Sequence, residues 1–395
     1  MKITDLKCAV IGDNPVIRIV TDEGISGYGQ AEASKSYLKP HVLFYRDMIL
    51  GLDPTDVEHV MLHIRRMGAF KPWGSSVSAI EMALWDLAGK AAGVPVYKLL
   101  GGKIRNRVRA YLTGGPFPMT GNKPEDYAAH VAKIKQMEEG YTLTKQAVSF
   151  HSQMPHTVPN YFYGEPVKGG LYLNRGLLTE RGLKHTIECA IAMKEVLGDE
   201  MGLALDCGPG MTVPDAIRFA QALEPYHITW LEDMITGDYT PYVMADLYRQ
   251  VTESTSTPIH TGEQIYLRQH FKELFEKQAV NIVGPDPADV GGIAELKWVA
   301  EYADLHGILM APHGVIDGMF GLAAHVHVGA TLPQNLIAFE CPQAPDWWHD
   351  IVTGLPDPIV KDGFVEVWDA PGLGVEFIEA EAKRYLAEED VDFFD

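Results

Sequence analysis

Three acidic residues recur along the middle of the chain at the spacing of one strand–helix unit. Asp206, Glu232 and Glu263 lie 26 and 31 residues apart, each at the end of a short apolar run. Carboxylates that converge at one edge of a sheet repel one another unless a cation lies among them, and an all-oxygen ligand set suits Mg²⁺. Acids at strand ends also cap the next helix, but three in succession favour a magnesium site.

A histidine and an aspartate form a second candidate group. His313 follows the run Ile308–Pro312, and Asp286 follows the preceding run, Asn281–Pro285. A carboxylate that holds one imidazole nitrogen fixes the tautomer and makes the other nitrogen more basic. The pattern predicts that His313 is a general base oriented by Asp286, although a histidine in such a place can also be structural.

Lys145 and three further histidines have competing interpretations. Lys145 lies inside a strand-like run, where it is costly unless it meets negative charge. We expect it to face the acidic residues; the alternative is an outward position between helices. We expect His260, His325 and His327 to be structural, with His260 on the opposite face of its strand from Glu263.

Eight strand-like runs would position these residues. They alternate with helical patterns about every thirty residues, as in a parallel α/β barrel, whose functional groups stand at the C-terminal strand ends. An open doubly wound sheet fits less well, because no G-x-G-x-x-G sequence follows the early runs. The runs are Val108–Leu112, Thr142–Val148, Gly202–Asp206, Ile228–Glu232, Ile259–Glu263, Asn281–Pro285, Ile308–Pro312 and Leu336–Glu340.

The segments that flank these runs predict a second, α+β domain. Lys7–Ile11 and Pro15–Val20 are typical of strands, and Val77–Ala91 has one apolar helical face with Gly93 as a stop signal. We expect a capping domain of residues 1–105, completed by residues 360–395, beside a barrel of residues 106–359.

Residues 149–178 interrupt the barrel pattern with a long segment rich in Tyr, Pro, Gly and His. Loops of this length inside a compact domain are commonly functional, and the aromatic residues favour packing over disorder. We predict a lid; a surface excursion or an oligomer contact is the alternative.

Composition excludes several classes of function. The 395 residues carry a net charge of −20, which disfavours binding to nucleic acid or to anionic membranes. We find no apolar run long enough to span a bilayer, no signal-peptide pattern and no paired cysteines. We expect a soluble, cytoplasmic protein with a small-molecule substrate and a homo-oligomeric state.

The chain resembles the mandelate racemase-like group of the enolase superfamily over nearly its whole length. The matching segments occur in the family order and together are highly specific for it. They are TDEGISGYG at 21–29, SAIEMALWDLAGK at 78–90, GVPVY at 93–97, Pro285-Asp286 followed by Gly291-Gly292-Ile293, and PGLG at 371–374.

The resemblance implies a modified TIM barrel, (β/α)₇β, under an N-terminal α+β capping domain. It implies that Asp206, Glu232 and Glu263 bind one Mg²⁺ and that the His313–Asp286 dyad removes the proton α to a carboxylate. It also implies that Glu340, kept protonated by surrounding negative charge, donates a hydrogen bond to the substrate carboxylate.

Departures from the family pattern decide the predicted activity. Lys145 aligns with the first lysine of the K-x-K motif of racemases, but Ala147 replaces the second, and Gly208 stands where some sugar-acid dehydratases have a histidine. One base, His313, remains, which suits syn elimination of water from a sugar acid to a 2-keto-3-deoxy acid.

The substrate and any second acid–base group are less constrained. We expect aromatic and basic residues of the capping domain and the insertion to bind the polyol chain: Phe70, Lys71, Trp73, Tyr161 and Tyr163. A racemase, epimerase or cycloisomerase would use Lys145 or an insertion tyrosine as a second acid or base. A barrel without catalytic function is a further, less favoured alternative.

Overall fold

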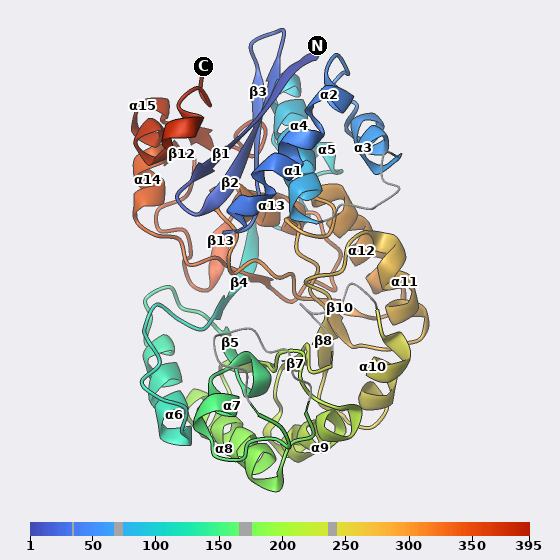
Figure 1. Cartoon of the computed structure of the whole chain (residues 1–395), viewed down its shortest axis with the longest axis vertical. Coiled ribbons are helices and arrows are strands. Elements are labelled where there is room, and N and C mark those ends of the chain that lie inside the picture. Colours follow the sequence, from blue (N-terminus) through green and yellow to red (C-terminus); the bar gives the residue numbers. More distant parts are fainter. Residues whose placement is uncertain (34, 67–73, 166–175, 236–242) are drawn as a thin grey trace.

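A ring of parallel strands surrounded by helices forms the lower part of the molecule in Figure 1, and an antiparallel sheet with its own helices forms the upper part. The computed structural model describes residues 1–33, 35–66, 74–165, 176–235 and 243–395. The arrangement confirms the expected modified barrel with an N-terminal cap. Where one domain ends and the next begins stays a prediction.

The barrel contains all eight predicted strand positions. Its hydrogen-bonded order is β10-β9-β8-β7-β6-β5-β4-β11, and a bridge between Met310 and Leu336 joins β10 to the segment before β11, which closes the ring. The strands are β4 (Arg107–Thr113), β5 (Leu143–Ala147), β6 (Gly202–Asp206), β7 (Trp230–Glu232), β8 (Ile259–Thr261), β9 (Ile282–Val283), β10 (Leu309–Met310) and β11 (Phe339–Glu340).

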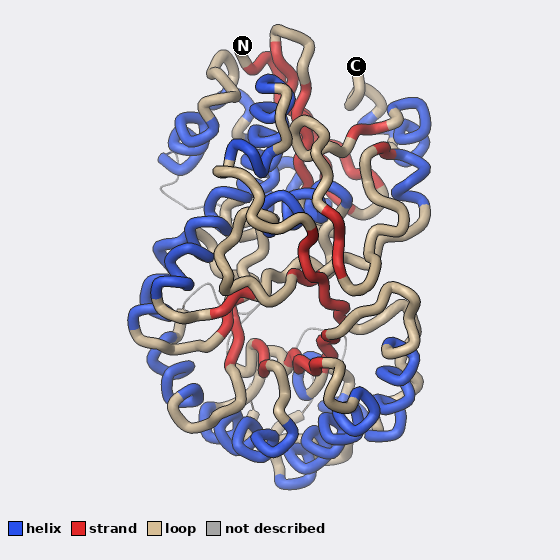
Figure 2. Tube along the Cα trace, turned by 180° about the vertical axis from the view of Figure 1, so that it is seen from behind, coloured by secondary structure: helices blue, strands red, loops and turns tan. Residues whose placement is uncertain are grey.

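Helices follow the barrel strands and cover the outside of the ring, as Figure 2 shows from behind. Local sequence sets several helix ends: the Thr179 and Thr212 side chains accept hydrogen bonds from Gly182 N and Asp215 N at the starts of α8 and α9. The helices are α6 (Pro124–Ile134), α8 (Glu180–Leu197), α9 (Val213–Leu223), α10 (Ala245–Thr252), α11 (Arg268–Glu276), α12 (Ile293–Leu305) and α13 (Met319–Gly329).

Both faces of the upper sheet pack against other parts of the molecule. Its strands alternate side chains between the two faces: Ile11 and Val16 join the barrel's hydrophobic cluster, whereas Ile17 and Ile19 join a second cluster with α4. As predicted, α4 ends at Gly93, which has a left-handed conformation. The elements are β1 (Ile3–Ile11), β2 (Asn14–Thr21), β3 (Ser26–Gln30), α1 (Lys39–Phe44), α2 (Arg46–Ile49), α3 (Val57–Arg66), α4 (Ser75–Ala92) and α5 (Val96–Leu99).

The C-terminal segment returns to the upper sheet. Figure 1 shows α14 and α15 beside β1 and β2, and Val10 N donates to Asp390 Oδ2 at 3.1 Å. On the way, β13 pairs with β4 of the barrel, so this segment contacts both parts of the molecule. Its elements are α14 (Trp347–Ile351), β12 (Val352–Thr353), β13 (Phe364–Glu366), β14 (Glu376–Phe377) and α15 (Glu379–Ala382).

The described part of the insertion packs against the barrel. It contains a short 3₁₀ helix, Ser149–His151, and α7 (Met154–Thr157), and a bridge joins Phe162 to Leu178. Phe150 packs edge-on against the rings of Tyr161 and Phe162. A role of residues 149–178 as a lid stays a prediction.

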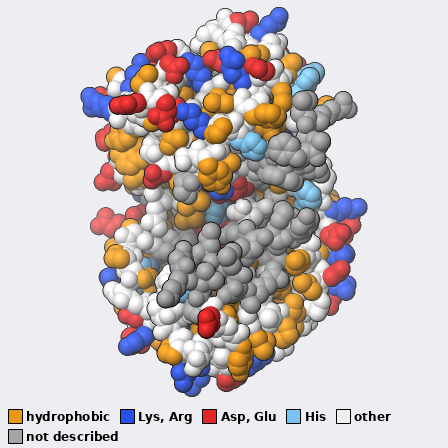
Figure 3. All heavy atoms as spheres, viewed as in Figure 1, with side chains coloured by type: hydrophobic (Ala, Val, Ile, Leu, Met, Phe, Trp, Pro, Cys, Tyr) orange, Lys and Arg blue, Asp and Glu red, His pale blue; other side chains and the backbone are white. Residues whose placement is uncertain are grey.

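The surface carries charges of both signs. On the face drawn in Figure 3, Asp and Glu side chains lie among Lys and Arg on both the upper and lower parts. Among the helices of the described residues, none combines the length and the apolar character needed to cross a bilayer.

Candidate active site

The three predicted metal ligands come together at the C-terminal end of the barrel. Asp206 and Glu232 are the last residues of β6 and β7 and are direct partners in the strand register, and Glu263 follows β8. All three side chains are buried, and each offers an oxygen within 4.8 Å of the others. The strand ends therefore position an all-oxygen ligand set, as expected for parallel strands.

Lys145 projects from β5 into this acidic cluster. Its Nζ lies 2.6 Å from Glu232 Oε1, 3.1 Å from Glu340 Oε1 and 3.7 Å from Asp206 Oδ2, and its side chain is 1% exposed. Burial by itself lowers the pKa of Lys145, but Glu232 and Glu340 raise it well above its usual value. Lys145 is therefore a buried cation that compensates part of the acidic charge.

His313 and Asp286 form the predicted dyad. His313 Nδ1 lies 2.6 Å from Asp286 Oδ2, and Asp286 Oδ1 accepts a hydrogen bond from Ala288 N at 2.6 Å. Burial raises the pKa of Asp286 to about 6, with His313 opposing the rise. Asp286 thus fixes one nitrogen of the ring and leaves Nε2 for chemistry.

The second nitrogen of His313 faces the acidic cluster. His313 Nε2 lies 3.7 Å from Glu263 Oε2 and 3.5 Å from Glu340 Oε2. Burial by itself lowers the pKa of His313, but Glu263, Glu340 and Asp286 raise it well above its usual value. A substrate held at the acidic cluster would therefore meet this nitrogen.

The groups around Glu340 favour its ionised form, whereas the resemblance implies a protonated one. Burial by itself raises its pKa, but Lys145, His313, the Thr113 hydroxyl and Gly314 N lower it to about 2. The Thr113 hydroxyl donates to Oε1, and Gly314 N donates to Oε2 at 3.1 Å. Because these partners are hydrogen-bond donors or cations, the surroundings of Glu340 favour an ionised acceptor, and its contact with a substrate carboxylate stays a prediction.

A carboxylate of the capping region, Glu32, was missed by the sequence reasoning. It is 1% exposed, and its Oε1 lies 3.9 Å from His313 Nδ1. Lys35 pairs with Glu32 and with Asp289, the latter at 3.3 Å. Burial raises the pKa of Glu32 well above its usual value, with Asp289 and Asp286 adding to the rise. The loop after β3 thus contributes to the surroundings of the dyad. Glu32 does not follow a barrel strand, so the pattern of acids at the barrel strand ends did not predict it.

His151 is a second group that sequence reasoning missed. It lies in the 3₁₀ helix after β5, and its Nδ1 lies 3.0 Å from Asp206 Oδ1. Its position four residues after the end of β5 could have indicated a place near the site. The irregular insertion that begins there gives no periodic pattern from which the direction of the chain could be predicted.

His260 is not on the face expected for it. Its Nδ1 lies 3.3 Å from Glu232 Oε2, and its ring stacks on Trp230 inside the barrel. The strand β8 ends at Thr261, so strict alternation does not extend to Glu263, and both side chains reach the acidic cluster.

The predicted substrate-binding residues have different outcomes. Tyr161 is 1% exposed, and its hydroxyl lies 2.9 Å from Ser149 Oγ and 2.7 Å from Thr186 Oγ1. This core position argues against contact with a substrate. Tyr163 is 72% exposed, and its contact with a substrate stays a prediction. Phe70, Lys71 and Trp73 lie outside the described residues.

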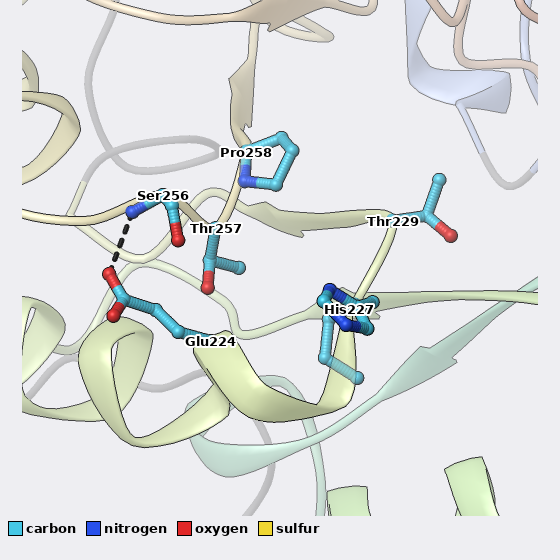
Figure 4. Close-up of a pocket in the computed structure, with 7 residues that line it drawn as sticks. Glu224, His227, Thr229, Ser256, Thr257 and Pro258 are labelled. Atoms are coloured by element: carbon cyan, nitrogen blue, oxygen red, sulfur yellow. Dashed lines mark hydrogen bonds between the residues drawn. The ribbon is translucent and has the colours of Figure 1, made fainter.

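A cavity at the other end of the barrel is separate from these residues. Figure 4 shows Glu224 and Ser256 on its wall, in segments that precede β7 and β8; its volume is about 340 Å³. Glu224 Oε1 accepts hydrogen bonds from Ser256 N at 2.7 Å and Thr255 Oγ1 at 2.9 Å. Glu224 therefore holds two loops together at the face opposite the acidic cluster.

The acidic cluster fits a divalent cation. Asp206, Glu232 and Glu263 converge with Glu340 beside them, and Lys145 compensates only part of this negative charge. Buried charge without compensation is unfavourable, and hard oxygen donors at this spacing suit a hard divalent ion.

Comparisons with known proteins agree with this arrangement. Residues 13–101 match the mandelate racemase/muconate lactonizing enzyme N-terminal domain, and residues 129–381 match the enolase C-terminal domain-like family. The D-xylonate dehydratase of Haloferax volcanii is 32% identical over 95% of this chain and 86% of its own length. A D-mannonate dehydratase of Caulobacter sp. is 31% identical over 98% of this chain and 95% of its own length.

A solved structure extends the match to three dimensions. A mandelate racemase/muconate lactonizing enzyme-like protein from Rubrobacter xylanophilus is 32% identical, with a TM-score of 0.83 and 98% of each chain covered. The chain therefore belongs to the mandelate racemase/muconate lactonizing enzyme family of the enolase superfamily.

Proposed function

We propose that this protein is a magnesium-dependent acid-sugar dehydratase, a hydro-lyase that converts a sugar acid to a 2-keto-3-deoxy acid. Three of its relatives are named D-xylonate dehydratase, D-galactonate dehydratase family member and D-mannonate dehydratase. The observation that carries the proposal is the position of His313 Nε2, which faces the acidic cluster while Asp286 holds Nδ1.

The cation is proposed to be Mg²⁺, one per chain, held by Asp206, Glu232 and Glu263. When bound, it supplies positive charge beside the substrate carboxylate, which makes the α-proton more acidic. Lys145 lies at the same edge of the site and stabilises developing negative charge through its ammonium group.

His313 removes the α-proton in this proposal. Asp286 orients the ring and stabilises the positive charge that the ring acquires. The electron pair left on the α-carbon expels the β-hydroxyl, which leaves as water once it has gained a proton. If His313 also supplies that proton, both transfers occur on one face and the elimination is syn; a donor on the opposite side makes it anti.

A substrate screen tests the proposal. The protein is incubated with magnesium and a panel of acid sugars, including D-xylonate, D-mannonate and D-galactonate, and the 2-keto product is measured. His313→Asn is expected to lower kcat by about 10²–10⁴-fold, and Glu232→Gln to abolish magnesium-dependent turnover, with both variants folded by circular dichroism. The exposed His349→Asn is the matched control. Full activity of His313→Asn would contradict the assignment of the base.

A racemase, epimerase or cycloisomerase would give a different result. Substrate recovered from D₂O would carry deuterium at the α-carbon, and no 2-keto product would form. We further propose that the protein acts in the cytoplasm as a homo-oligomer on a small-molecule substrate; size-exclusion chromatography with light scattering tests the oligomeric state.

A further inference from the structure

His151 lies at the rim of the acidic cluster on a short, well-packed segment. Its Nδ1 lies 3.0 Å from Asp206 Oδ1, while 42% of its side chain is exposed. Its backbone N–H lies 3.1 Å from both Val148 O and Cys207 O, which ties the segment to the end of β6. A carboxylate therefore holds one nitrogen of an imidazole that is partly exposed.

Gly208 leaves the space that this segment occupies. A Cβ atom at position 208 would lie 2.7 Å from His151 N and 3.0 Å from His151 Cα, and Gly208 has a φ of +63°. A side chain at this position and the present path of the 149–152 segment exclude each other. The chain thus brings a histidine to this corner of the site from the loop after β5 instead of from β6.

Contacts of residues 149–152 fix the position of His151. Ser149 has a φ of 51°, a conformation that non-glycine residues adopt only when the surroundings enforce it. Tyr161 donates to Ser149 Oγ at 2.9 Å, and Ser152 donates to Ser149 O at 2.8 Å. The Phe150 ring, which a Cβ at Gly210 would approach to 2.1 Å, fills the space beneath. These contacts fix the backbone on both sides of His151.

His151 and His313 lie on opposite sides of the ring. His151 contacts the last residue of β6, and His313 follows β10. In the closed order, β6 lies four strands from β10 in both directions, through β9, β8 and β7 or through β11, β4 and β5. A substrate bound at the acidic cluster between them has one imidazole on each side.

We propose that His151 is the catalytic residue that protonates the departing hydroxyl, an assignment that rests on the proposed dehydratase function. His313 Nε2 takes the α-proton, the C–H electron pair forms the carbon–carbon double bond, and the C–O bond breaks. The proton on His151 Nε2 passes to the hydroxyl, which leaves as water on the side opposite to His313, so the elimination is anti. Solvent protonates the resulting enol at carbon to give the keto acid and returns both imidazoles to their starting states.

Separate measurement of the two proton transfers tests this assignment. In D₂O with magnesium, His151→Asn is expected to keep exchange of the α-proton within about threefold of the unsubstituted protein while dehydration falls about 10²–10⁴-fold. His313→Asn is expected to lose both. His227→Asn, at the opposite end of the barrel where its φ of 52° suits asparagine, is the matched control and retains both reactions.

Replacement of the leaving group sharpens the test. A β-fluoro analogue of the substrate loses fluoride, which needs no proton donor. His151→Asn is expected to release fluoride at a rate close to that of the unsubstituted protein, and His313→Asn is not. Loss of α-proton exchange or of fluoride release in His151→Asn would overturn the assignment. If the unsubstituted protein dehydrates no acid sugar, the proposed function fails instead, so the two failures are distinguishable.

A second variant and a metal readout exclude a merely structural role. Gly208→Ala displaces the segment without altering the imidazole, and we expect it to lower dehydration more than α-proton exchange. The rise in melting temperature that magnesium produces is expected to be unchanged in His151→Asn. A reduced rise in that variant would mean that His151 acts by holding Asp206 for the metal, and it would overturn the proposal.

Discussion

Lys145 is the residue on which the charge balance of the acidic cluster depends. It contacts three carboxylates and is almost fully buried. Loss of one partner from a buried ionic network leaves the remaining charges without compensation, at a cost of about 3–5 kcal/mol. A bound divalent cation offsets part of that cost.

Lys145→Met is therefore expected to lower the melting temperature strongly in EDTA and less in excess magnesium. Thermal unfolding followed by circular dichroism under both conditions measures the difference. The control is Lys184→Met, which removes an exposed lysine whose pair with Glu188 is 3.7 Å long, and it should change stability by less than about 1 kcal/mol. An equal loss with and without magnesium would contradict a cation at this cluster.

His327 predicts a pH dependence of stability. It is buried on α13, and its Nε2 lies 3.1 Å from Leu373 O. Burial lowers its pKa from 6.5 to about 4, with the Leu373 carbonyl opposing the shift. As pH falls below 6.5, His327 binds a proton in the unfolded chain, but in the folded protein it does so only near pH 4. The free energy of unfolding therefore decreases over this interval.

Urea unfolding between about pH 7 and about pH 5 measures this contribution. The cost of His327→Gln is expected to shrink as pH falls, by roughly 1–3 kcal/mol over the interval, because glutamine does not titrate. His349→Gln, at an exposed position, should show no such trend. A pH-independent cost of His327→Gln would show that the folded protein binds the proton as readily as the unfolded chain does.

Residue type and spacing predicted most of the candidate site but not the charge states within it. Asp206, Glu232, His313 and Asp286 follow strands whose ends share one edge, so their convergence follows from the barrel. The direction in which the pKa of Glu340 shifts depends on how closely Lys145 approaches it, and that distance follows from the fold. His151 follows an irregular turn at Ser149, and such a turn has no periodic signal.

At the scale of elements, the packing of β3 on α4 depends on glycine. A Cβ atom at Gly29 would lie 2.0 Å from Ala79 O, so strand and helix approach at backbone distance. Gly29→Ala is expected to cost at least about 2 kcal/mol, because neither element can move without disturbing its core.

Gly24 provides the comparison for this prediction. A Cβ there meets nothing within 4 Å, but the φ of +77° disfavours alanine, so Gly24→Ala should cost about 1 kcal/mol. Urea unfolding of the two variants measures the difference. Equal costs would show that strain of the backbone, and not the contact with α4, dominates at Gly29.

The strand positions were predictable, whereas the strand lengths were not. Alternation and apolar runs located all eight strands, but β9, β10 and β11 each have two residues in the structure. The run Asn281–Pro285, for example, is longer than the strand β9, Ile282–Val283, that the structure contains. The path of the chain after such a run depends on tertiary packing, so local sequence patterns do not predict it.

At the scale of the whole molecule, a buried carboxylate of α4, Glu81, connects the capping region to the barrel. Glu81 accepts hydrogen bonds from Ile293 N at 2.7 Å and Ala294 N at 3.0 Å, at the start of α12. Together with the shared hydrophobic cluster, these contacts predict that both parts unfold together.

Calorimetry of Glu81→Ala tests this coupling. The substitution leaves two buried N–H groups of α12 without acceptors, at a cost of about 2 kcal/mol or more. One unfolding transition is expected in both proteins, shifted as a whole to lower temperature in the variant. Glu200→Ala, at an exposed position, should leave the transition in place. Two separate transitions would contradict the coupling.

The pairing of β4 has a consequence for synthesis on the ribosome. Strand β4 pairs with β5 on one edge and with β11 on the other, and Phe339 of β11 follows Thr113 of β4 by 226 residues. At about 5–20 residues per second, translation leaves that edge without its partner for roughly 10–45 s. During this interval the nascent chain presents an unpaired strand edge, which is a site where another chain can pair.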